Sequence, residues 1–431
     1  MNNLEKRVTR EWVLPKSSFI VKKESLVPFS LLLFYLFLEY GRPQDLLPFL
    51  SVLHLSGVTI VLLALSVIRS GKFQLKEKQT ILYLFLLALM VIHGPIAVNN
   101  YWALMVFIAM AMNFIVYLSL IRSVNNMDKY DKLLKTWIGI HVFLAIIGIV
   151  KHGRGIGGFL GDENDFCLAL NMIIPLPFFL AISASGKKRI YYVALTCLFL
   201  FVIMLTGSRG GFVGLCTAFV YCWFRAKQKF LVTFILLVLA IFAYFAAPKT
   251  YSDRIHSITE EGTTEGTGEA RVYTWNIGWH MFLDNPIMGV GQGNFPYVFG
   301  KYEFEVTGSR EPFHGRSVAG RQAHSVYFTL LPELGLMGTI PFLLIIYYTF
   351  KDLKRIKKIA LKNMNTKARF QPDRFYYIAL ALEGSLITYL VSSVFISTLY
   401  YPNIWFLIGF IISYKIILVS KEKNDAFVST I

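Results

Sequence analysis

The sequence predicts an all-α integral membrane protein, built as one polytopic domain over residues 1–431 with about twelve transmembrane helices. Hydrophobic residues make up 55% of the chain, charged residues make up only 16%, and the mean hydropathy is +0.54. A soluble domain carries about 25% charged residues, so this chain has too few charges to cover a water-facing surface. Lipid can replace that missing polar coat, and apolar stretches of membrane-spanning length recur along the chain.

Twelve apolar stretches are candidates for membrane spans, since a spanning helix needs about 20 mostly apolar residues. They are residues 25–41, 47–68, 79–98, 101–121, 134–150, 166–184, 189–206, 210–224, 230–247, 324–349, 375–398 and 401–420. The third and fourth nearly touch and predict a hairpin with a tight turn, whereas the eighth is short. The polar, basic N-terminus runs directly into the first stretch, as in an uncleaved signal anchor.

Basic residues alternate between abundant and sparse from one connection to the next, as the positive-inside rule requires. Of the 43 lysines and arginines, 32 fall on one predicted side, together with both termini. The other 11 are Arg42, Lys151, Arg154, Arg209, Lys249, Arg254, Arg271, Lys301, Arg310, Arg316 and Arg321. The alternation predicts cytoplasmic termini. Because the basic residues lie in loops between apolar runs, the net charge of +17 does not indicate nucleic-acid binding.

Residues 248–323 form one large predicted outer loop. Its segment Ser257–Ala270 is rich in Gly, Thr and Glu and predicts a mobile segment. The next segment, Arg271–Leu283, predicts a helix at the membrane interface that ends at Asn285–Pro286. One face of that helix carries three aromatic residues, Trp275, Trp279 and Phe282. The glycine turn Gly289–Phe295 is not a dinucleotide loop, because no strand precedes it.

Three outer-side features contain the residues best suited to chemistry. Arg209 lies in TGSRGG, where neighbouring glycines let a bulky anion approach and the guanidinium fork suits phosphate. Arg271 is expected at the start of the loop helix, where an anion would offset its unfavourable placement near the positive helix end. His324, preceded by Arg321, lies at the start of the tenth span, where an imidazole can take a proton from a hydroxyl. Arg154 is a further candidate for binding substrate.

The outer connections lack a DxD-like pair, a His/Cys ligand cluster, an HExxH motif and a P-loop. One acidic cluster, Asp162, Glu163 and Asp165, is weak support for a divalent ion. The four cysteines, Cys167, Cys197, Cys216 and Cys222, lie in or beside apolar runs and are expected to pack rather than to bind zinc or form disulfides. We therefore expect no cofactor and a metal-free reaction on an anionic substrate.

Several polar residues elsewhere have no assigned role. Glu39 and Asp45 flank the outer end of the first span, where a carboxylate can act as a general base or cap the turn. Glu383 lies in the eleventh span, where burying a carboxylate is costly and its role stays open. His93 and His141 are expected to form hydrogen bonds between helices.

The stretch AHSVYFTLLPELGLMG resembles a motif of the bacterial O-antigen ligase family. His324–Ser325, nine residues, Gly335, two residues and Gly338 fit the pattern H-[NSQ]-x9-G-x-x-[GTY], and Glu333 precedes the first glycine. The segments GDENDFCLALNMIIPL, TGSRGGFVGL and RVYTWNIGWHMFLDNPIMGVGQGNF resemble further blocks of that family. The resemblance covers most of residues 154–341, and it departs from the family at Val213, where a leucine is usual.

The resemblance implies a GT-C-like glycosyltransferase of the bacterial inner membrane that acts in lipopolysaccharide biosynthesis. Such an enzyme takes a glycan from undecaprenyl diphosphate at the periplasmic face and passes it to a hydroxyl of lipid A–core, with inversion. Carried onto this sequence, Arg209 and Arg271 hold the diphosphate, His324 deprotonates or orients the acceptor, and Arg321 adds a third positive contact. The segment Ser257–Ala270 would act as a lid.

Three alternatives stay open on sequence grounds. An O-antigen polymerase usually has two large outer loops with R-x10-G motifs, whereas here one loop is large and none of its arginines precedes a glycine at that spacing. A ligase for another acceptor would use the same residues. A transporter would explain the spans, but transporters usually place charge near the membrane midplane.

Overall fold

The computed structural model describes residues 27–69, 75–226, 229, 233, 267–309, 312–313, 315, 317–365 and 372–428. The regular elements of this part are helices. The first half of the chain forms α1 (Val27–Gly41), α2 (Pro43–Leu46), η1 (Pro48–Leu53), α3 (Leu55–Arg69), α4 (Lys78–Ile96), α5 (Asn100–Ser123), α6 (Met127–Val150), η2 (Gly158–Leu160), α7 (Glu163–Ile173) and α8 (Pro175–Ser183). The second half forms α9 (Gly186–Thr206), α10 (Arg209–Arg225), α13 (Thr267–Asp284), α14 (Phe295–Thr307), α15 (Val326–Asn365), α16 (Pro372–Ser392) and α17 (Pro402–Val428).

The prediction of an all-α integral membrane protein is confirmed. Within the described residues, nine helical segments are long and apolar enough to cross a membrane, and α1 is a shorter apolar helix. Eleven of the twelve predicted stretches coincide with helices, whereas the stretch 230–247 lies outside the described residues, apart from Thr233. The count of twelve therefore stays a prediction.

Two predicted boundaries were wrong. The stretch 375–398 was expected to be one span, but α16 ends at Ser392 and the chain runs irregularly to α17. The loop helix was expected to begin at Arg271, but α13 begins at Thr267, so the last residues of Ser257–Ala270 form its first turn. Residues 257–266 of that segment lie outside the described part.

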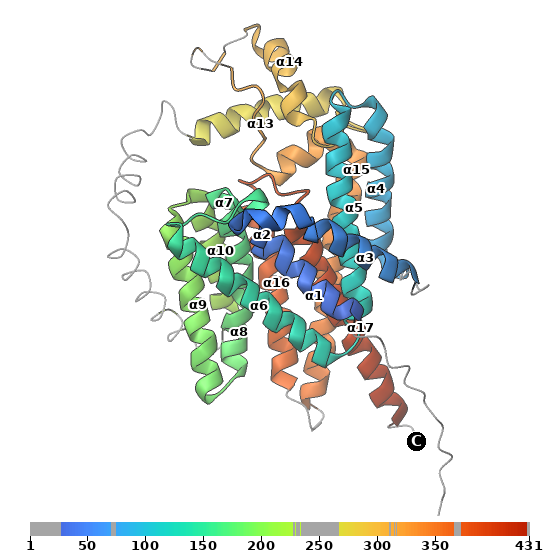
Figure 1. The fold of residues 1–431 in the computed structure, drawn as a ribbon, viewed down its shortest axis with the longest axis vertical. Helices are drawn as coiled ribbons and strands as arrows, with labels where there is room; N and C mark the ends of the chain where they lie inside the picture. Colours follow the sequence, from blue (N-terminus) through green and yellow to red (C-terminus); the bar gives the residue numbers. More distant parts are fainter. Residues whose placement is uncertain are drawn as a thin grey trace, which may run out of the picture.

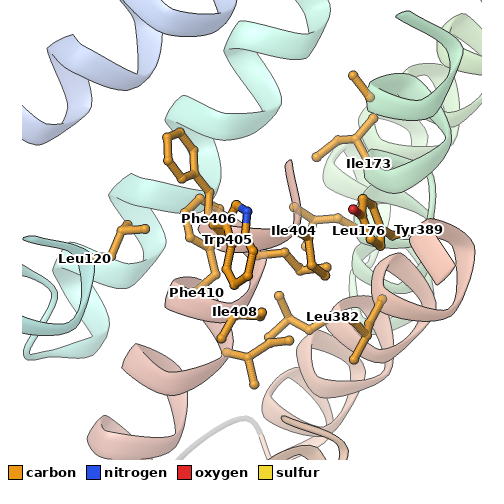
Figure 2. Close-up of a cluster of buried hydrophobic side chains, with 14 of the residues drawn as sticks. Leu120, Ile173, Leu176, Leu382, Tyr389, Ile404, Trp405, Phe406, Ile408 and Phe410 are labelled. Atoms are coloured by element: carbon orange, nitrogen blue, oxygen red, sulfur yellow. The ribbon is translucent and has the colours of Figure 1, made fainter. Parts of the chain in front are cut away.

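The main core surrounds α17, the most enclosed of the membrane-length helices. Figure 2 shows its residues Ile404, Trp405, Phe406, Ile408 and Phe410 among Leu120 of α5, Ile173 and Leu176 of α7 and α8, and Leu382 and Tyr389 of α16. Trp405 is 1% exposed, and its indole nitrogen donates to the carbonyl of Leu399 at 3.0 Å. A buried indole N–H needs such a partner, so this bond also fixes the chain just before α17.

Helices α13 and α14 lie at one end of the bundle, which we call the cap end; the other end carries the C-terminus of α17 (Figure 1). The two helices share a small core of their own, formed by Ile277, Met281, Phe295, Val298, Phe299, Tyr302, Phe313, Val318 and Ala323. The buried Glu303 ties this core together, because its carboxylate accepts hydrogen bonds from Tyr273 at 3.2 Å and from Ser317 at 2.5 Å.

The loop between α13 and α14 fastens this unit to the bundle. Gln292 is fully buried, and its amide nitrogen donates to the carbonyls of Met90 and Ala103 on α4 and α5. Its amide oxygen lies 3.2 Å from Nδ1 of His93, so that histidine bonds this loop, whereas a bond to a second helix had been expected. The glycine turn Gly289–Phe295 therefore docks the unit of α13 and α14 onto α4 and α5.

The same loop pairs with a break in α15 at Gly335, which has φ 56° and ψ −160°. The amide of Met337 donates to the carbonyl of Ile287 at 3.0 Å, beside the break. A Cβ atom on Gly335 would lie 2.4 Å from that carbonyl oxygen. Both the positive φ and the close backbone approach therefore require glycine.

Candidate functional site

His324 lies at the cap end, immediately before the first turn of α15, and its backbone is held from both sides. The indole nitrogen of Trp275 on α13 donates to the carbonyl of Ala323 at 2.8 Å. On the other side, the amide of Ser325 donates to Oγ of Ser397 at 3.2 Å. Between these anchors His324 has φ 48°, in the left-handed region, which costs a non-glycine residue about 1–2 kcal/mol. The anchors maintain that conformation and leave the imidazole solvent-accessible.

Arg271 is one helical turn before Trp275, so both side chains lie on the same side of α13. The Trp275 ring stacks on Phe328 of α15, with 5.0 Å between centroids and an interplanar angle of 4°. This stack and the bond to Ala323 set the position of α13 against the start of α15. They therefore also set the position of Arg271 relative to His324.

Arg209 is the first residue of α10, and the polar residues around it connect α10 to the start of α7. Ser208 caps α10 by accepting from the amide of Gly211 at 2.8 Å, and its hydroxyl donates to Asn164 at 2.6 Å. The side chain of Asn164 donates in turn to Oδ1 of Asp162, the N-cap of α7, at 2.9 Å. Arg209 is exposed beside this network.

The glycines of the segment Thr206–Gly211 also have a role in packing helix against helix. A Cβ atom on Gly211 would lie 2.5 Å from Sγ of Cys167 on α7, so only glycine lets the two helices approach this closely. Cys167 itself is fully buried and free, as expected for a packing cysteine. The segment thus places Arg209 at the junction of α7 and α10.

Electrostatic effects show that the predicted residues share one environment. Partial burial lowers the pKa of His324 below its ordinary value of 6.5, and the charges of Arg271 and Arg321 lower it further, whereas Asp162 opposes them. Partial burial also lowers the pKa of Arg271, and the neighbouring charge of Arg209 adds to the effect. The imidazole is therefore mostly neutral at pH 7 and able to accept a proton.

None of these four basic groups forms a direct ion pair within the described part of the chain. Their side chains form no hydrogen bond, and no ion pair within 4 Å, with any described residue; the four are Arg209, Arg271, Arg321 and His324. Two mutually repelling guanidiniums without a directly paired carboxylate form a site suited to a multiply charged anion.

The other predicted substrate residues lie at the edge of this cluster. Arg321 is exposed in an irregular segment, so it does not precede His324 on a helical turn, although its charge acts on that histidine. Arg154 lies in the connection after α6, and its guanidinium pairs with Glu163 at 3.2 Å. No described contact brings Arg154 to the cluster.

The spacing from His324 to Gly335 corresponds to a short first segment of α15, which ends where the helix breaks. Near the break, the buried carboxylate of Glu333 accepts from the amides of Gly293 and Phe295 at 2.7 and 3.0 Å and from the hydroxyl of Tyr400 at 2.6 Å. His324 therefore lies two residues before the first residue of this segment, and Glu333, which binds the α13–α14 loop, lies near its end.

The remaining polar residues lie outside the cluster. Asp45 pairs with Arg42 at 2.5 Å, and Glu39 accepts from Tyr35 at 3.2 Å, so both make local contacts at the end of α1. His141 bonds the carbonyl of Trp137 on its own helix at 2.8 Å, so its expected interhelical bond was wrong. Glu383 lies at the opposite end, where it accepts from Tyr221, Arg225 and Lys357.

Sequence reasoning missed Trp275 and Asp162 as site residues. Trp275 was expected to face the membrane interface with Trp279, but it turns toward α15 and anchors the backbone beside His324. Its position one turn after Arg271 could have indicated this role. Asp162, named before only as part of an acidic cluster, is the carboxylate whose charge acts on both Arg271 and His324.

Comparison with known proteins agrees with the predicted resemblance. The O-antigen ligase family model matches residues 194–343 of this chain, a range that includes Arg209, Arg271 and His324. The teichuronic acid biosynthesis protein TuaE of Bacillus subtilis (strain 168) is 24% identical over 277 residues. That alignment covers 56% of this chain and 54% of TuaE, so the chain spans about half the length of this relative.

Proposed function

We propose, from the premise that residues 194–343 match the O-antigen ligase family, that this protein is a membrane glycosyltransferase of the ligase type. It transfers a glycan from undecaprenyl diphosphate to a hydroxyl of lipid A–core, without a metal ion and with inversion. The observation that carries the proposal is the cluster of Arg209, Arg271 and His324, in which two guanidiniums without counter-ions adjoin a mostly neutral imidazole.

The chemistry follows from the charges. The acceptor oxygen attacks the anomeric carbon of the donor sugar, a new C–O bond forms, and the bond to the diphosphate breaks on the opposite face. Negative charge grows on the leaving diphosphate, and Arg209 and Arg271 stabilise it where it develops. His324 takes the proton from the acceptor hydroxyl, which its lowered pKa permits at neutral pH. Two guanidiniums can supply the charge stabilisation that a divalent cation would otherwise give.

We place the protein in the bacterial inner membrane with the cap end in the periplasm and both termini in the cytoplasm. Helix α9 starts at the end of the bundle opposite to α13 (Figure 1), and its first turn contains Lys187, Lys188 and Arg189. The basic C-terminal part of α15 lies at the same end (Figure 1). The positive-inside rule assigns such an end to the cytoplasm. The cap-end cluster then faces the leaflet where a lipid-linked donor and a lipid acceptor are both presented.

A test replaces His324 in a deletion strain. His324→Ala is expected to insert into the membrane normally but to lower glycan transfer by about 10²–10⁴-fold, the usual contribution of a general base. Lipopolysaccharide from that strain should show bare core, with the polymer accumulating on its carrier lipid. Long-chain lipopolysaccharide at wild-type level would contradict the role of His324.

A different acceptor or a polymerase reaction is the second candidate. The relative TuaE is named for teichuronic acid biosynthesis, so a similar chain is associated with a polysaccharide other than O-antigen. The deletion strain separates these candidates. Core that carries a single repeat unit would indicate a polymerase, and unchanged lipopolysaccharide with loss of another surface polymer would indicate a ligase for another acceptor.

A further inference from the structure

Helix α13 has two opposite faces of different character. Thr274, Ile277 and Met281 are buried and belong to the side that packs with α14. Val272, Trp279 and Leu283 are 63%, 44% and 51% exposed. At 100° per residue these three point about 170° away from the buried set, so the exposed apolar face is turned away from α14.

The direction of that face follows from the arrangement of the cap. Figure 1 shows α14 on the far side of α13 from the helical bundle, with α13 lying across the bundle near the level of the α4–α5 turn. A face turned away from α14 therefore points back toward the membrane-spanning part. It does not pack on the bundle within the described structure, since its residues are exposed.

The exposed face continues into the surface of a membrane-length helix. Ile287, 64% exposed, lies four residues after Leu283 and beyond the end of α13, and its carbonyl accepts from the amide of Met337 of α15 at 3.0 Å. Beyond that contact, α15 exposes Leu336, Ile340, Leu343 and Tyr347, which recur at helical spacing along one face. An exposed apolar stripe on a spanning helix is lipid-facing, and the stripe of α13 adjoins it through two backbone contacts at Pro286 and Ile287.

We propose that α13 is an interfacial helix whose face Val272, Trp279 and Leu283 contacts the lipid of the cap-end leaflet, together with Ile287 just beyond its end. Tryptophan suits this position because its ring is apolar and its N–H is polar. Arg271 precedes Val272 directly, so the depth of the helix in the interface sets the height of Arg271 above the hydrocarbon. This inference concerns membrane contact and does not depend on the reaction proposed above.

Site-directed spin labelling in lipid vesicles tests the contact. All four cysteines are replaced by alanine, and single cysteines are introduced at Val272, Trp279 and Leu283, with a control at Glu305 on α14, whose side chain is 46% exposed. Labels on the α13 face are expected to collide several-fold more often with oxygen than with a water-soluble nickel complex, and the label at 305 should show the reverse. Water-like accessibility at all four positions would overturn the proposal. Spin–spin broadening at the α13 positions would assign the face to a second copy of the chain and overturn it equally.

A second measurement keeps the native cysteines. Tryptophan fluorescence is quenched with lipids brominated close to the headgroup, in the wild type, Trp279→Phe and Trp275→Phe. The quenched fraction is expected to fall in Trp279→Phe and to stay or rise in Trp275→Phe, because Trp275 is stacked between α13 and α15. An unchanged quenched fraction in Trp279→Phe would show that its ring does not reach the lipid.

Discussion

The clustered basic residues of the cap end differ from those at the opposite end of the bundle in whether a carboxylate pairs with them. At the end opposite to the cap, Lys357 lies 2.5 Å and Arg225 2.9 Å from Glu383, and Arg374 binds Asp131 through two nitrogens at 2.8 and 2.9 Å. Lys415 likewise pairs with Glu77 and Asp352. At the cap end, Arg209, Arg271 and Arg321 have no such carboxylate among the described residues.

The difference separates charges that are paired within the fold from charges that we propose bind a ligand. A desolvated charge must be paired or hydrogen-bonded, and the end opposite to the cap meets that requirement with its own carboxylates. At the cap end, the half-buried Arg271 would meet it with an anion supplied from outside. A lipid-linked diphosphate presented at that surface would provide the missing charge.

The largest expected effect is at the cap end. Arg271→Lys keeps the charge but loses the planar fork that binds phosphate through two nitrogens. We expect transfer to fall by about 10²–10³-fold, the usual effect of removing one donor that stabilises developing charge. The matched control is Arg225→Lys, which makes the same replacement beside Glu383 and should leave transfer unchanged. Equal losses in both variants would contradict the division between the two ends.

Removing the central carboxylate of the opposite end should affect stability instead. Glu383→Gln leaves Lys357 and Arg225 without their counter-ion, and we expect the free energy of unfolding to fall by about 2 kcal/mol. This expected loss of stability is smaller than that for a fully buried ion pair, because the Arg225 side chain is 39% exposed. Thermal unfolding in detergent measures the change, and transfer per folded molecule should stay at the wild-type level. A loss of transfer without a loss of stability would place Glu383 in the reaction.

The spans could be predicted from sequence, and so could the choice of the three central residues of the proposed site. An apolar stretch of about 20 residues identifies a spanning helix without knowledge of its neighbours. Arg209, Arg271 and His324 stood out because they are polar residues at apolar boundaries on the sparsely basic side. Their shared electrostatic environment was then found in the structure.

The residues that support the site could not be predicted, because their partners are distant in the chain. The Glu333 carboxylate receives its hydrogen bonds from Gly293, Phe295 and Tyr400, which only the fold brings together. Trp275 has the spacing of an interfacial aromatic residue, and only the position of α15 turns it inward. The break of α15 at Gly335 depends on the carbonyl of Ile287, which lies in another element.

A smaller effect is expected where an indole bond holds the site backbone. Trp275→Phe removes the bond to the carbonyl of Ala323 but keeps an aromatic ring on Phe328. We expect kcat to fall about tenfold, equivalent to one lost hydrogen bond, with little change in KM because Arg209 and Arg271 remain. Trp223→Phe is the matched control, since Trp223 donates at the same 2.8 Å to Thr233. A rise in KM without a fall in kcat would show that Trp275 acts on binding instead of on His324.

The smallest expected effect is a shift in pH dependence. The base must be neutral, so kcat/KM should fall as the pH drops through the pKa of His324, which burial, Arg271 and Arg321 place below 6.5. Arg321→Ala removes one like charge and therefore raises that pKa, so the acidic limb should move to higher pH. Asp162 acts in the opposite sense, and Asp162→Asn should move the same limb downward. If the acidic limb of the pH profile stays at the same pH in both variants, the charges around His324 do not control its protonation. The contrast between the two ends of the bundle would then concern ligand binding alone.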